Sequence, residues 1–319
     1  VQMDDNTQMV PDPKLSQPRI LVVGTGAVGG FYGGKLAQTG ARVATLCRSD
    51  YETVRSEGID IKSTYGDFIF APDQVIRDLK EYGSPPDYIL VALKVLPEID
   101  TAEIIRTTVG PETVIVLLQN GVEIDEPVAQ AFPDNEIISG LAFICVTRSA
   151  PGHIEHIDFG RLVIGRYPAG PSEKTDKLAA LFNKAGVPCE VTEDVVTARW
   201  RKLVWNAPFN PISVLGGSAD TKTMMENPES EKLARQVMEE VCRIAEAAGH
   251  SLPNDVVKQN LDGTRKMAPY KTSMLVDFET GRPMEVEAIL GNALRTAARH
   301  NVAAPHMESL YALLKLLDK

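Results

Sequence analysis

Lys202, Asn206 and Asn210 form the most unusual polar pattern in the chain, because they are four residues apart among apolar neighbours that include two tryptophans. On a helix this spacing places all three on one face, in a row about 12 Å long. Unpaired polar groups are costly beside apolar neighbours, which favours a lined cavity where an ammonium and two amides meet one small molecule. The same spacing also fits a helix end whose asparagines bind free carbonyls, and spacing alone does not choose between the two.

Two prolines lie within this segment. Pro208 should kink the helix, because proline lacks the backbone N–H that an interior position needs. Pro211 disfavours helical geometry at Asn210, which precedes it. We therefore expect the lower part of the row to be redirected.

A second pattern with chemical meaning is a glycine-rich turn after the aliphatic run at residues 19–23. It has the G-x-G-x-x-G spacing and consists of Gly24, Thr25, Gly26, Ala27, Val28 and Gly29. Gly24 permits a tight turn, Gly26 lets the backbone approach a pyrophosphate, and Gly29 allows close helix–strand packing. The N-terminus of the following helix would bind the phosphates. This context favours a dinucleotide site over a simple glycine-rich turn.

The residue after the second expected strand indicates which dinucleotide binds. NAD-binding proteins usually carry an acidic residue there, which accepts hydrogen bonds from the ribose, whereas this chain has Arg48. A guanidinium can bind a 2′-phosphate through two parallel hydrogen bonds, so we expect NADP(H). Lys94, after a later strand, would add a second cation at the same edge of the sheet. Either residue could instead be an ordinary exposed side chain.

Strands and helices should alternate in the first half of the chain. Short aliphatic runs typical of buried parallel strands lie at 19–23, 42–46, 87–93, 113–118 and 137–143. Helix-compatible segments between them lie at 27–39, 97–108 and 122–132. This alternation predicts an α/β fold with a doubly wound, mostly parallel sheet of the Rossmann type. Short alternating runs around Pro151–Gly152 and Phe159–Gly160 predict hairpins at the sheet edge.

Strand signals largely disappear after Asp194, and helical periodicity continues to the C-terminus. The second half is therefore expected to be all-helical, with the boundary near 190–195. We expect a polar leader over residues 1–17, an NADP-binding Rossmann domain over 18–193, and a helical substrate and dimerisation domain over 194–319.

Composition and charge restrict the partners. Lys and Arg number 33 against 43 Asp and Glu, and the net charge of −10 disfavours nucleic acid and anionic membranes, so an anionic small molecule would need local cations. The four cysteines form no C-x-x-C pair and the first residues lack an export signal, so we expect a cytoplasmic protein. We expect no metal site, because His153, Glu155 and His156 lie in a predicted hairpin where alternate side chains face opposite ways.

Taken together, these motifs resemble the ketopantoate reductase (2-dehydropantoate 2-reductase) family. The resemblance runs from residue 18 to the end and includes the glycine turn, Lys94, Gln119-Asn120-Gly121, the K-x-x-x-N-x-x-x-N-P row, and Ser273-Met274 followed by Asp277 and Glu285. It implies a Rossmann domain followed by a helical domain like the C-terminal one of 6-phosphogluconate dehydrogenase. It also implies NADPH-dependent reduction of a 2-keto acid to a D-type 2-hydroxy acid, on the route to pantothenate and coenzyme A.

The resemblance implies roles for single residues. Lys202 would be the general acid that protonates the carbonyl oxygen, and its desolvation against tryptophans would lower its pKa. Asn206 and Asn210 would bind the substrate hydroxyl, and Ser273 would bind the polar end of the substrate. Asn120 would lie close to both nicotinamide and substrate.

Two acidic residues complete the expected site. Asp220 stands where some members carry a substrate-binding asparagine, and a carboxylate there would disfavour an anionic ligand, which leaves the identity of the 2-keto acid open. Glu285 would lie near the cofactor ribose and the reacting centre. Without the resemblance, Pro283 would be the first residue of a helix and Glu285 a carboxylate in its first turn. Such a carboxylate interacts favourably with the helix dipole.

Three functions remain in view. The first is ketopantoate reduction, the second is reduction of a different branched or hydroxylated 2-keto acid, and the third is an NADP-binding sensor without turnover. Lys202 argues against a sensor, which has no use for a proton donor aligned with two amides. Apolar helices in the second half also suggest a homodimer.

Overall fold

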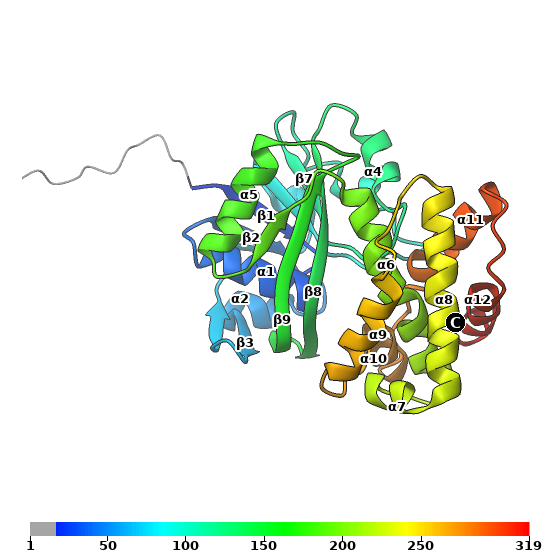
Figure 1. Ribbon diagram of the computed structural model, residues 1–319. Helices are drawn as coiled ribbons and strands as arrows, with labels where there is room; N and C mark the ends of the chain where they lie inside the picture. The colour runs from blue at the N-terminus through cyan, green and yellow to red at the C-terminus, as the bar shows by residue number, and fades with distance from the viewer. Residues whose placement is uncertain (1–16, 319) are drawn as a thin grey trace, which may run out of the picture.

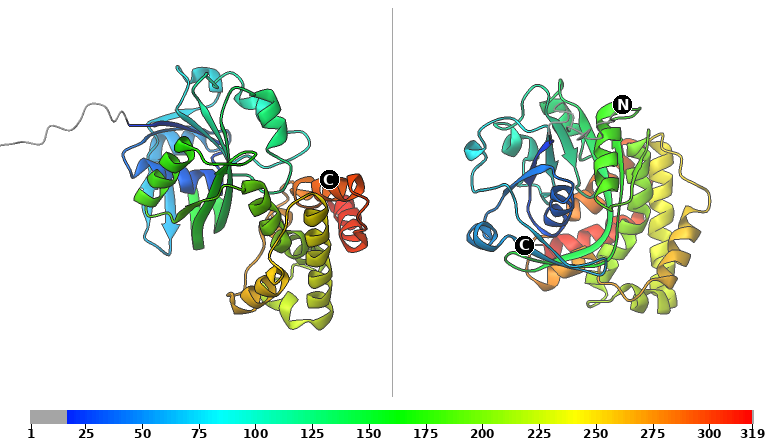
Figure 2. Two further views of the ribbon diagram at one scale, coloured as in Figure 1. Left: turned by 45° about the horizontal axis from the view of Figure 1, so that its top comes forward. Right: turned by 90° about the vertical axis from the view of Figure 1, so that its left-hand side faces the viewer.

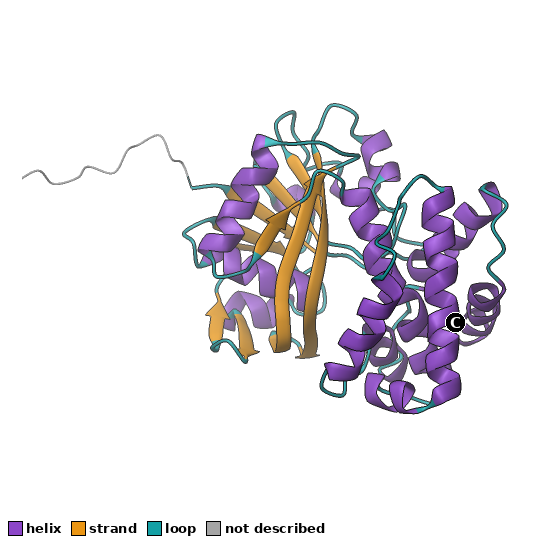
Figure 3. Cartoon of the chain, viewed as in Figure 1, coloured by secondary structure: helices purple, strands orange, loops and turns teal. Residues whose placement is uncertain are grey.

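The computed structural model describes residues 17–318, so the predicted leader lies outside the described residues except for Gln17. Figure 1 shows a lobe built around a sheet beside a lobe built of helices, and Figure 3 shows the same division by secondary structure. The turned views in Figure 2 also show the two lobes beside each other. Over residues 17–318, none of the helices combines the length and the apolar character needed to cross a membrane.

All strands of the described residues belong to one sheet. They are β1 (Arg19–Val23), β2 (Arg42–Leu46), β3 (Ile59–Ser63), β4 (Phe68–Phe70), β5 (Gln74–Ile76), β6 (Tyr88–Val91), β7 (Val114–Leu117), β8 (Ile137–Ala150), β9 (His153–Arg166) and β10 (Cys189–Val191). Their order is β4-β3-β9-β8-β7-β6-β1-β2-β5, with β10 paired to β9. From β5 to β8 every pair is parallel, and the order matches that of dinucleotide-binding sheets. The predicted Rossmann-type sheet is confirmed.

Helices cover both faces of this sheet, because the parallel strands are apolar on both sides. The helical segments of this lobe are α1 (Ala27–Ala37), α2 (Tyr51–Glu57), the 3₁₀ turn η1 (Leu79–Glu81), α3 (Thr101–Ile105), α4 (Glu126–Ala131) and α5 (Glu173–Lys184). Phe31 of α1 and Phe182 of α5 are buried in the core on one face. Ile105 of α3 and Val128 of α4 are buried in the core on the other. The helices expected at 97–108 and 122–132 exist but are shorter.

β8 and β9 form a single long antiparallel hairpin whose turn contains Pro151 and Gly152. The second turn expected at Phe159–Gly160 is wrong. Phe159 and Arg161 pair with consecutive residues of β8, so Gly160 is the extra residue of a β-bulge, and both Phe159 and Gly160 have positive φ. The hairpin is not at the edge either, because β3 pairs with β9 on its outer side.

The second lobe is all-helical, as expected. It consists of α6 (Val195–Leu215), α7 (Thr221–Glu226), α8 (Pro228–Ala247), α9 (Val256–Lys266), α10 (Ser273–Glu279), the π-helical segment η2 (Glu287–Gly291), α11 (Asn292–Arg299) and α12 (Pro305–Leu317). α6 begins after Asp194, whose side chain accepts a hydrogen bond from Thr197 N. It packs against α8, α10 and α12 and also contacts β8 and β9.

α6 continues through both prolines to Leu215, so the expectation that Pro211 takes Asn210 out of helical geometry is wrong. Pro208 and Pro211 are buried in this helix among the residues that pack against its neighbours. The Nδ2 of Asn210 also donates a hydrogen bond to the backbone oxygen of Asn206, 3.1 Å away. Tertiary packing therefore outweighs the local preference of a residue before proline. As a result, the polar row extends unbroken along one helix.

Candidate functional site

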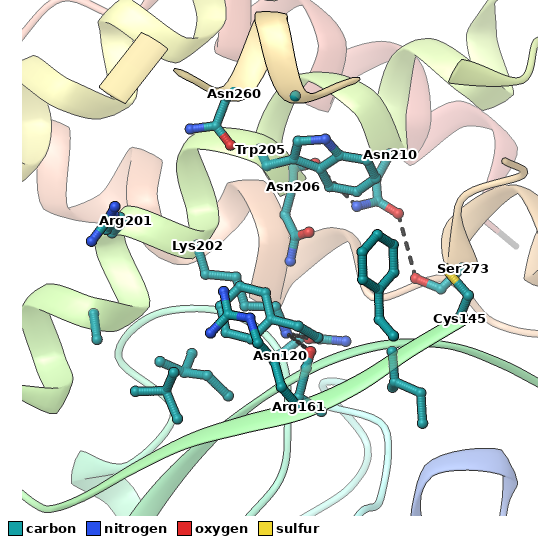
Figure 4. A pocket seen from close by; sticks show the side chains of 18 of the residues that line it. Asn120, Cys145, Arg161, Arg201, Lys202, Trp205, Asn206, Asn210, Asn260 and Ser273 are labelled. Atoms are coloured by element: carbon teal, nitrogen blue, oxygen red, sulfur yellow. Dashed lines mark hydrogen bonds between the residues drawn. The ribbon is translucent and has the colours of Figure 1, made fainter. Parts of the chain in front are cut away.

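A cavity of about 1140 Å³ separates the two lobes. Its walls come from β8 and β9 on one side and from α6, α9 and α10 on the other, and Val28 of the glycine turn also lines it. Figure 4 shows the labelled side chains that converge on this space from both lobes. Lys202, Asn206, Asn210, Asn120, Ser273 and Glu285 all line the cavity, so most of the expected substrate site is brought together.

Lys202 points from α6 towards the sheet lobe (Figure 4). Its Nζ donates hydrogen bonds to Asn120 Oδ1 at 2.8 Å and to the backbone oxygen of Ala142 at 2.7 Å. Loss of solvation, together with the positive charges of Arg199 and Arg161, lowers the pKa of Lys202 to about 7 against the opposing effect of Glu285. A lysine with such a pKa can both give and take a proton near neutral pH.

Asn120 and Glu285 extend this contact across the cleft. Asn120 lies in the loop after β7, and its side chain lowers the pKa of the nearby Glu285 carboxyl group. Glu285 Oε1 accepts a hydrogen bond from Val95 N at 2.9 Å, and desolvation raises its pKa. The helical segment begins at Val286, so Glu285 and Pro283 precede the helix, and the first-turn interpretation of Glu285 is wrong. Its hydrogen bond to Val95 N joins the lobes instead.

Arg199, which the sequence did not single out, fixes the loop that carries Asn120. Its guanidinium is buried in the sheet lobe, where Nη1 donates to the backbone oxygens of Gln119 at 2.8 Å and Gly121 at 3.1 Å. Nε lies 2.9 Å from Asp125 Oδ2, which makes a buried ion pair. The only sequence signal was its position one turn before Lys202 on the same helix. Arg199 therefore positions Asn120, whose Oδ1 accepts the hydrogen bond from Lys202.

The two asparagines of the row differ in their contacts. Within residues 17–318, the side chain of Asn206 has no hydrogen-bond partner, although it is largely buried and lines the cavity. In Figure 4 its amide points into the open space. Asn210 Oδ1 instead accepts from Met274 N at 3.3 Å and from Ser273 Oγ at 3.5 Å. Asn206 is thus available to a ligand, whereas Asn210 mainly joins α6 to α10.

Arg161 is a second cation that the sequence did not single out. It is exposed to the cavity from β9 and lies opposite Phe143 of β8 in the register of the hairpin. Its guanidinium carbon is 3.8 Å from the centroid of the Phe143 ring, and Lys202 Nζ is 5.4 Å from the same centroid. Two cations therefore face one ring, and they make this part of an otherwise acidic protein attractive to anions.

The glycine turn has the geometry of a phosphate-binding loop. Gly24 has a φ of +98°, and an added Cβ would lie 2.6 Å from the backbone of Ala92 and Leu93. A Cβ on Gly29 would lie 2.3 Å from Gly24 O, whereas a Cβ on Gly26 would meet nothing within 4 Å. Gly24 and Gly29 are required by close packing, and Gly26 leaves its outer face open.

The other residues of the turn have separate environments. Thr25 Oγ1 donates to Leu46 O at 2.9 Å, so its side chain contacts β2. Ala27 and Val28 begin α1, whose first turn lacks a side-chain cap. Their N–H groups are therefore free to bind an anion in the part of the chain that the structure describes.

The two cations expected near the cofactor lie in different surroundings. Arg48 is exposed just after β2, and no ion pair is found for its side chain among residues 17–318. Lys94 Nζ crosses the cleft instead, where it is 2.7 Å from Asp277 Oδ1 and donates to Pro283 O at 2.8 Å. Lys94 is therefore already paired with the helical lobe, and its expected contact with the cofactor would compete with that pair.

Asp220 is the expected substrate-binding residue that the structure does not bring to the cavity. It precedes α7, and its Oδ1 accepts a hydrogen bond from Thr223 N at 2.7 Å. That contact lowers the pKa of Asp220 and explains the residue as a helix cap. The carboxylate consequently gives no reason to exclude an anionic substrate.

Two family models match the chain, and both describe ketopantoate reductase. The model described as "Ketopantoate reductase PanE/ApbA" matches residues 20–169, and "Ketopantoate reductase PanE/ApbA C terminal" matches residues 194–318. A 2-dehydropantoate 2-reductase from Nostoc sp. is 36% identical over 309 residues, which are 95% of this chain and 96% of that protein.

Solved structures with the same name superpose closely on this chain. The 2-dehydropantoate 2-reductase from Methylococcus capsulatus is 53% identical with a TM-score of 0.88, and the match covers 94% of this chain and 96% of that one. The one from Geobacter metallireducens is 37% identical with a TM-score of 0.89, and the match covers 93% of this chain and 99% of that one.

Proposed function

The chain belongs to the ketopantoate reductase family of oxidoreductases, and we propose that it reduces 2-dehydropantoate (ketopantoate) to (R)-pantoate with NADPH, on the route to pantothenate and coenzyme A. One observation carries the proposal. Lys202 Nζ lies in the interlobe cavity, hydrogen-bonded to Asn120, and its pKa of about 7 suits a proton donor at neutral pH.

The residues of the sheet lobe fit a nicotinamide dinucleotide. Gly26 leaves room for a pyrophosphate, and the free N–H groups at the start of α1 would bind it. Arg48 follows β2, and the residues directly beside it in sequence are not acidic. The first acidic residue after it is Asp50, which pairs with Arg148. An exposed guanidinium there favours a 2′-phosphate and therefore NADP over NAD.

The bound nicotinamide supplies the hydride that reaches the C2 carbonyl carbon. Lys202 donates a proton from its ammonium to the carbonyl oxygen, so its N–H bond breaks as the new O–H bond forms. Asn120 orients the ammonium through the hydrogen bond at 2.8 Å, and Arg199 fixes the loop that carries Asn120. Asn206 offers its free amide to the hydroxyl of the substrate, and Ser273 lies further along the same wall.

The roles of the two lobes follow from this chemistry. Residues 18–193 bind the cofactor, and residues 194–319 contribute the proton donor and the amides. A cytoplasmic location and a homodimer remain part of the proposal.

The test is a substrate panel. Purified protein is mixed with NADPH and ketopantoate or other branched and hydroxylated 2-keto acids, and the loss of NADPH absorbance is followed. We expect ketopantoate to have the highest kcat/KM. A different best substrate would redefine the reaction, and NADPH binding without turnover of any 2-keto acid would indicate a sensor.

Lys202→Ala tests the proton donor separately. Loss of a general acid should lower kcat by roughly 10²- to 10⁴-fold. NADPH binding, measured by its fluorescence, should stay unchanged, because Lys202 lies on the helical lobe. A near-normal kcat would remove Lys202 from this role.

A further inference from the structure

Arg161 has an environment that its packing alone does not explain. Its guanidinium stacks on Phe143 at the wall of the cavity, but among residues 17–318 no carboxylate pairs with it and no protein acceptor receives its hydrogen bonds. Its positive charge lowers the pKa of Lys202, so the two cations repel each other across the same space. An anion that enters this space is attracted by both charges and relieves their mutual repulsion.

The β8–β9 hairpin has a β-bulge directly before Arg161. Gly160, immediately before Arg161, is the extra residue of the β9 bulge and has a φ of +125°. Bulges redirect the side chains that follow them and are frequent beside active sites. Because Phe143 pairs with Arg161 across the strands, the ring also restricts the guanidinium to one side of the cavity.

The cations Arg161 and Lys202 face the Phe143 ring, whereas the neutral groups of Asn206, Asn210 and Ser273 continue along α6 and α10. The carboxyl groups of Glu285 and Asp277 also line the cavity, but each already has a partner, Val95 N for Glu285 and Lys94 for Asp277. Figure 4 shows Arg161 beside Asn120 and Lys202, with Ser273 and Asn210 further along the space. A 2-keto acid has a matching division, since its carboxylate is adjacent to the reacting carbonyl and its tail is neutral.

We propose that Arg161 binds the carboxylate of the 2-keto acid and so sets the orientation and the acid specificity of the substrate. This inference rests on the proposed function. The two oxygens of the carboxylate accept hydrogen bonds from the guanidinium, which matches a carboxylate better than an ammonium does. The carbonyl oxygen then lies towards Lys202, and the tail extends towards Asn206 and Ser273.

The experiment compares a charged substrate with a neutral one. The charged one is the 2-keto acid that the wild type reduces fastest, and the neutral one is its methyl ester, measured as a substrate or, without turnover, as a competitive inhibitor. Arg161→Met should lower kcat/KM for the acid by roughly 10²- to 10³-fold, the range for losing a desolvated charge contact. Values for the ester and the KM for NADPH should stay within about threefold, because neither contact involves the guanidinium.

Two further variants make the comparison specific. Arg161→Lys keeps the charge but loses the paired hydrogen bonds, so it should recover about a tenth or more of the wild-type kcat/KM. Arg166→Met removes the same charge from an exposed position on the same strand, outside the cavity lining, and should behave as the wild type.

The inference is overturned if Arg161→Met affects acid and ester equally, which would mean a packing role, or raises the KM for NADPH alone, which would mean a cofactor contact. If the wild type reduces no 2-keto acid, the proposed function fails. The anion site is then judged by calorimetry with oxamate on the NADP⁺-loaded protein. Binding that is lost in Arg161→Met supports the site, and binding that is equal in both proteins, or absent from the wild type, contradicts it.

Discussion

The pH dependence of the proposed reaction follows from the environment of Lys202. A general acid acts only when protonated, and the pKa of this lysine is about 7 because the cavity removes its solvation. The protonated fraction is therefore about nine-tenths at pH 6 and about one-tenth at pH 8. We expect kcat/KM for 2-keto acid reduction to fall about tenfold over this range, with a midpoint near pH 7.

The assay follows NADPH consumption at a limiting concentration of the 2-keto acid, so that initial rates report the free enzyme. Oxidation of the 2-hydroxy acid with NADP⁺ gives an independent check, because there Lys202 must accept a proton. The rate of oxidation should rise with pH through the same midpoint. Matching profiles of opposite sign would identify one titrating group acting in both directions.

Glu285→Gln tests the cause of the midpoint. The carboxylate raises the pKa of Lys202, so its removal should move the fall in kcat/KM to lower pH. A wild-type midpoint above pH 9 would refute the reasoning, because it would mean that the ammonium is solvated like an ordinary lysine. A midpoint that does not move in Glu285→Gln would refute only the claim that Glu285 raises the pKa of Lys202.

Three other predictions concern single side chains. Arg48→Asp should shift the ratio of kcat/KM for NADPH to that for NADH towards NADH by roughly 10²-fold or more, and an unchanged ratio would exclude a 2′-phosphate contact. Asn206→Ala should raise the KM for the 2-keto acid with little change in thermal stability, whereas Asn210→Ala should lower stability by about 1–3 kcal/mol because it leaves buried partners unpaired. Lys202→Met should stabilise the protein by about 2 kcal/mol at pH 7. The lowered folded pKa of the lysine costs about 4 kcal/mol at this pH, and the loss of its hydrogen bonds to Asn120 and Ala142 takes back about 2 kcal/mol. This gain should shrink towards pH 10, and denaturation at both pH values checks it.

The local part of the fold was predictable because its signals are contiguous in sequence. The glycine turn lies between β1 and α1, and five of the strands coincide with aliphatic runs. The short strands β3, β4, β5 and β10 were not expected, because each depends on its partner in the sheet. β3 and β10 pair with β9, β4 pairs with β3, and β5 pairs with β2. The turn predicted at Phe159–Gly160 is a bulge instead, because bulges and turns share their residue types and only the pairing with β8 distinguishes them.

The site was predictable to the extent that it lies on one helix. Four-residue spacing places Lys202 and Asn206 on a common face whatever surrounds them. By contrast, Asp220 was assigned by correspondence with other chains, and its actual contact is a helix cap. Lys94 was expected at the cofactor, but only the approach of the second lobe provides Asp277 as its partner.

The sequence alone therefore determined the kind of chemistry: a dinucleotide turn, a lysine and two amides at helical spacing, and a cation where an acid would select NAD. Tertiary structure decided which of these groups are free to react. Segments far apart in the chain set the pKa of Lys202, leave the Asn206 amide and the Arg161 guanidinium without partners, and let the buried Arg199 hold the loop that carries Asn120. Desolvation and charge depend on distance in space, and residue order along the chain does not specify that distance.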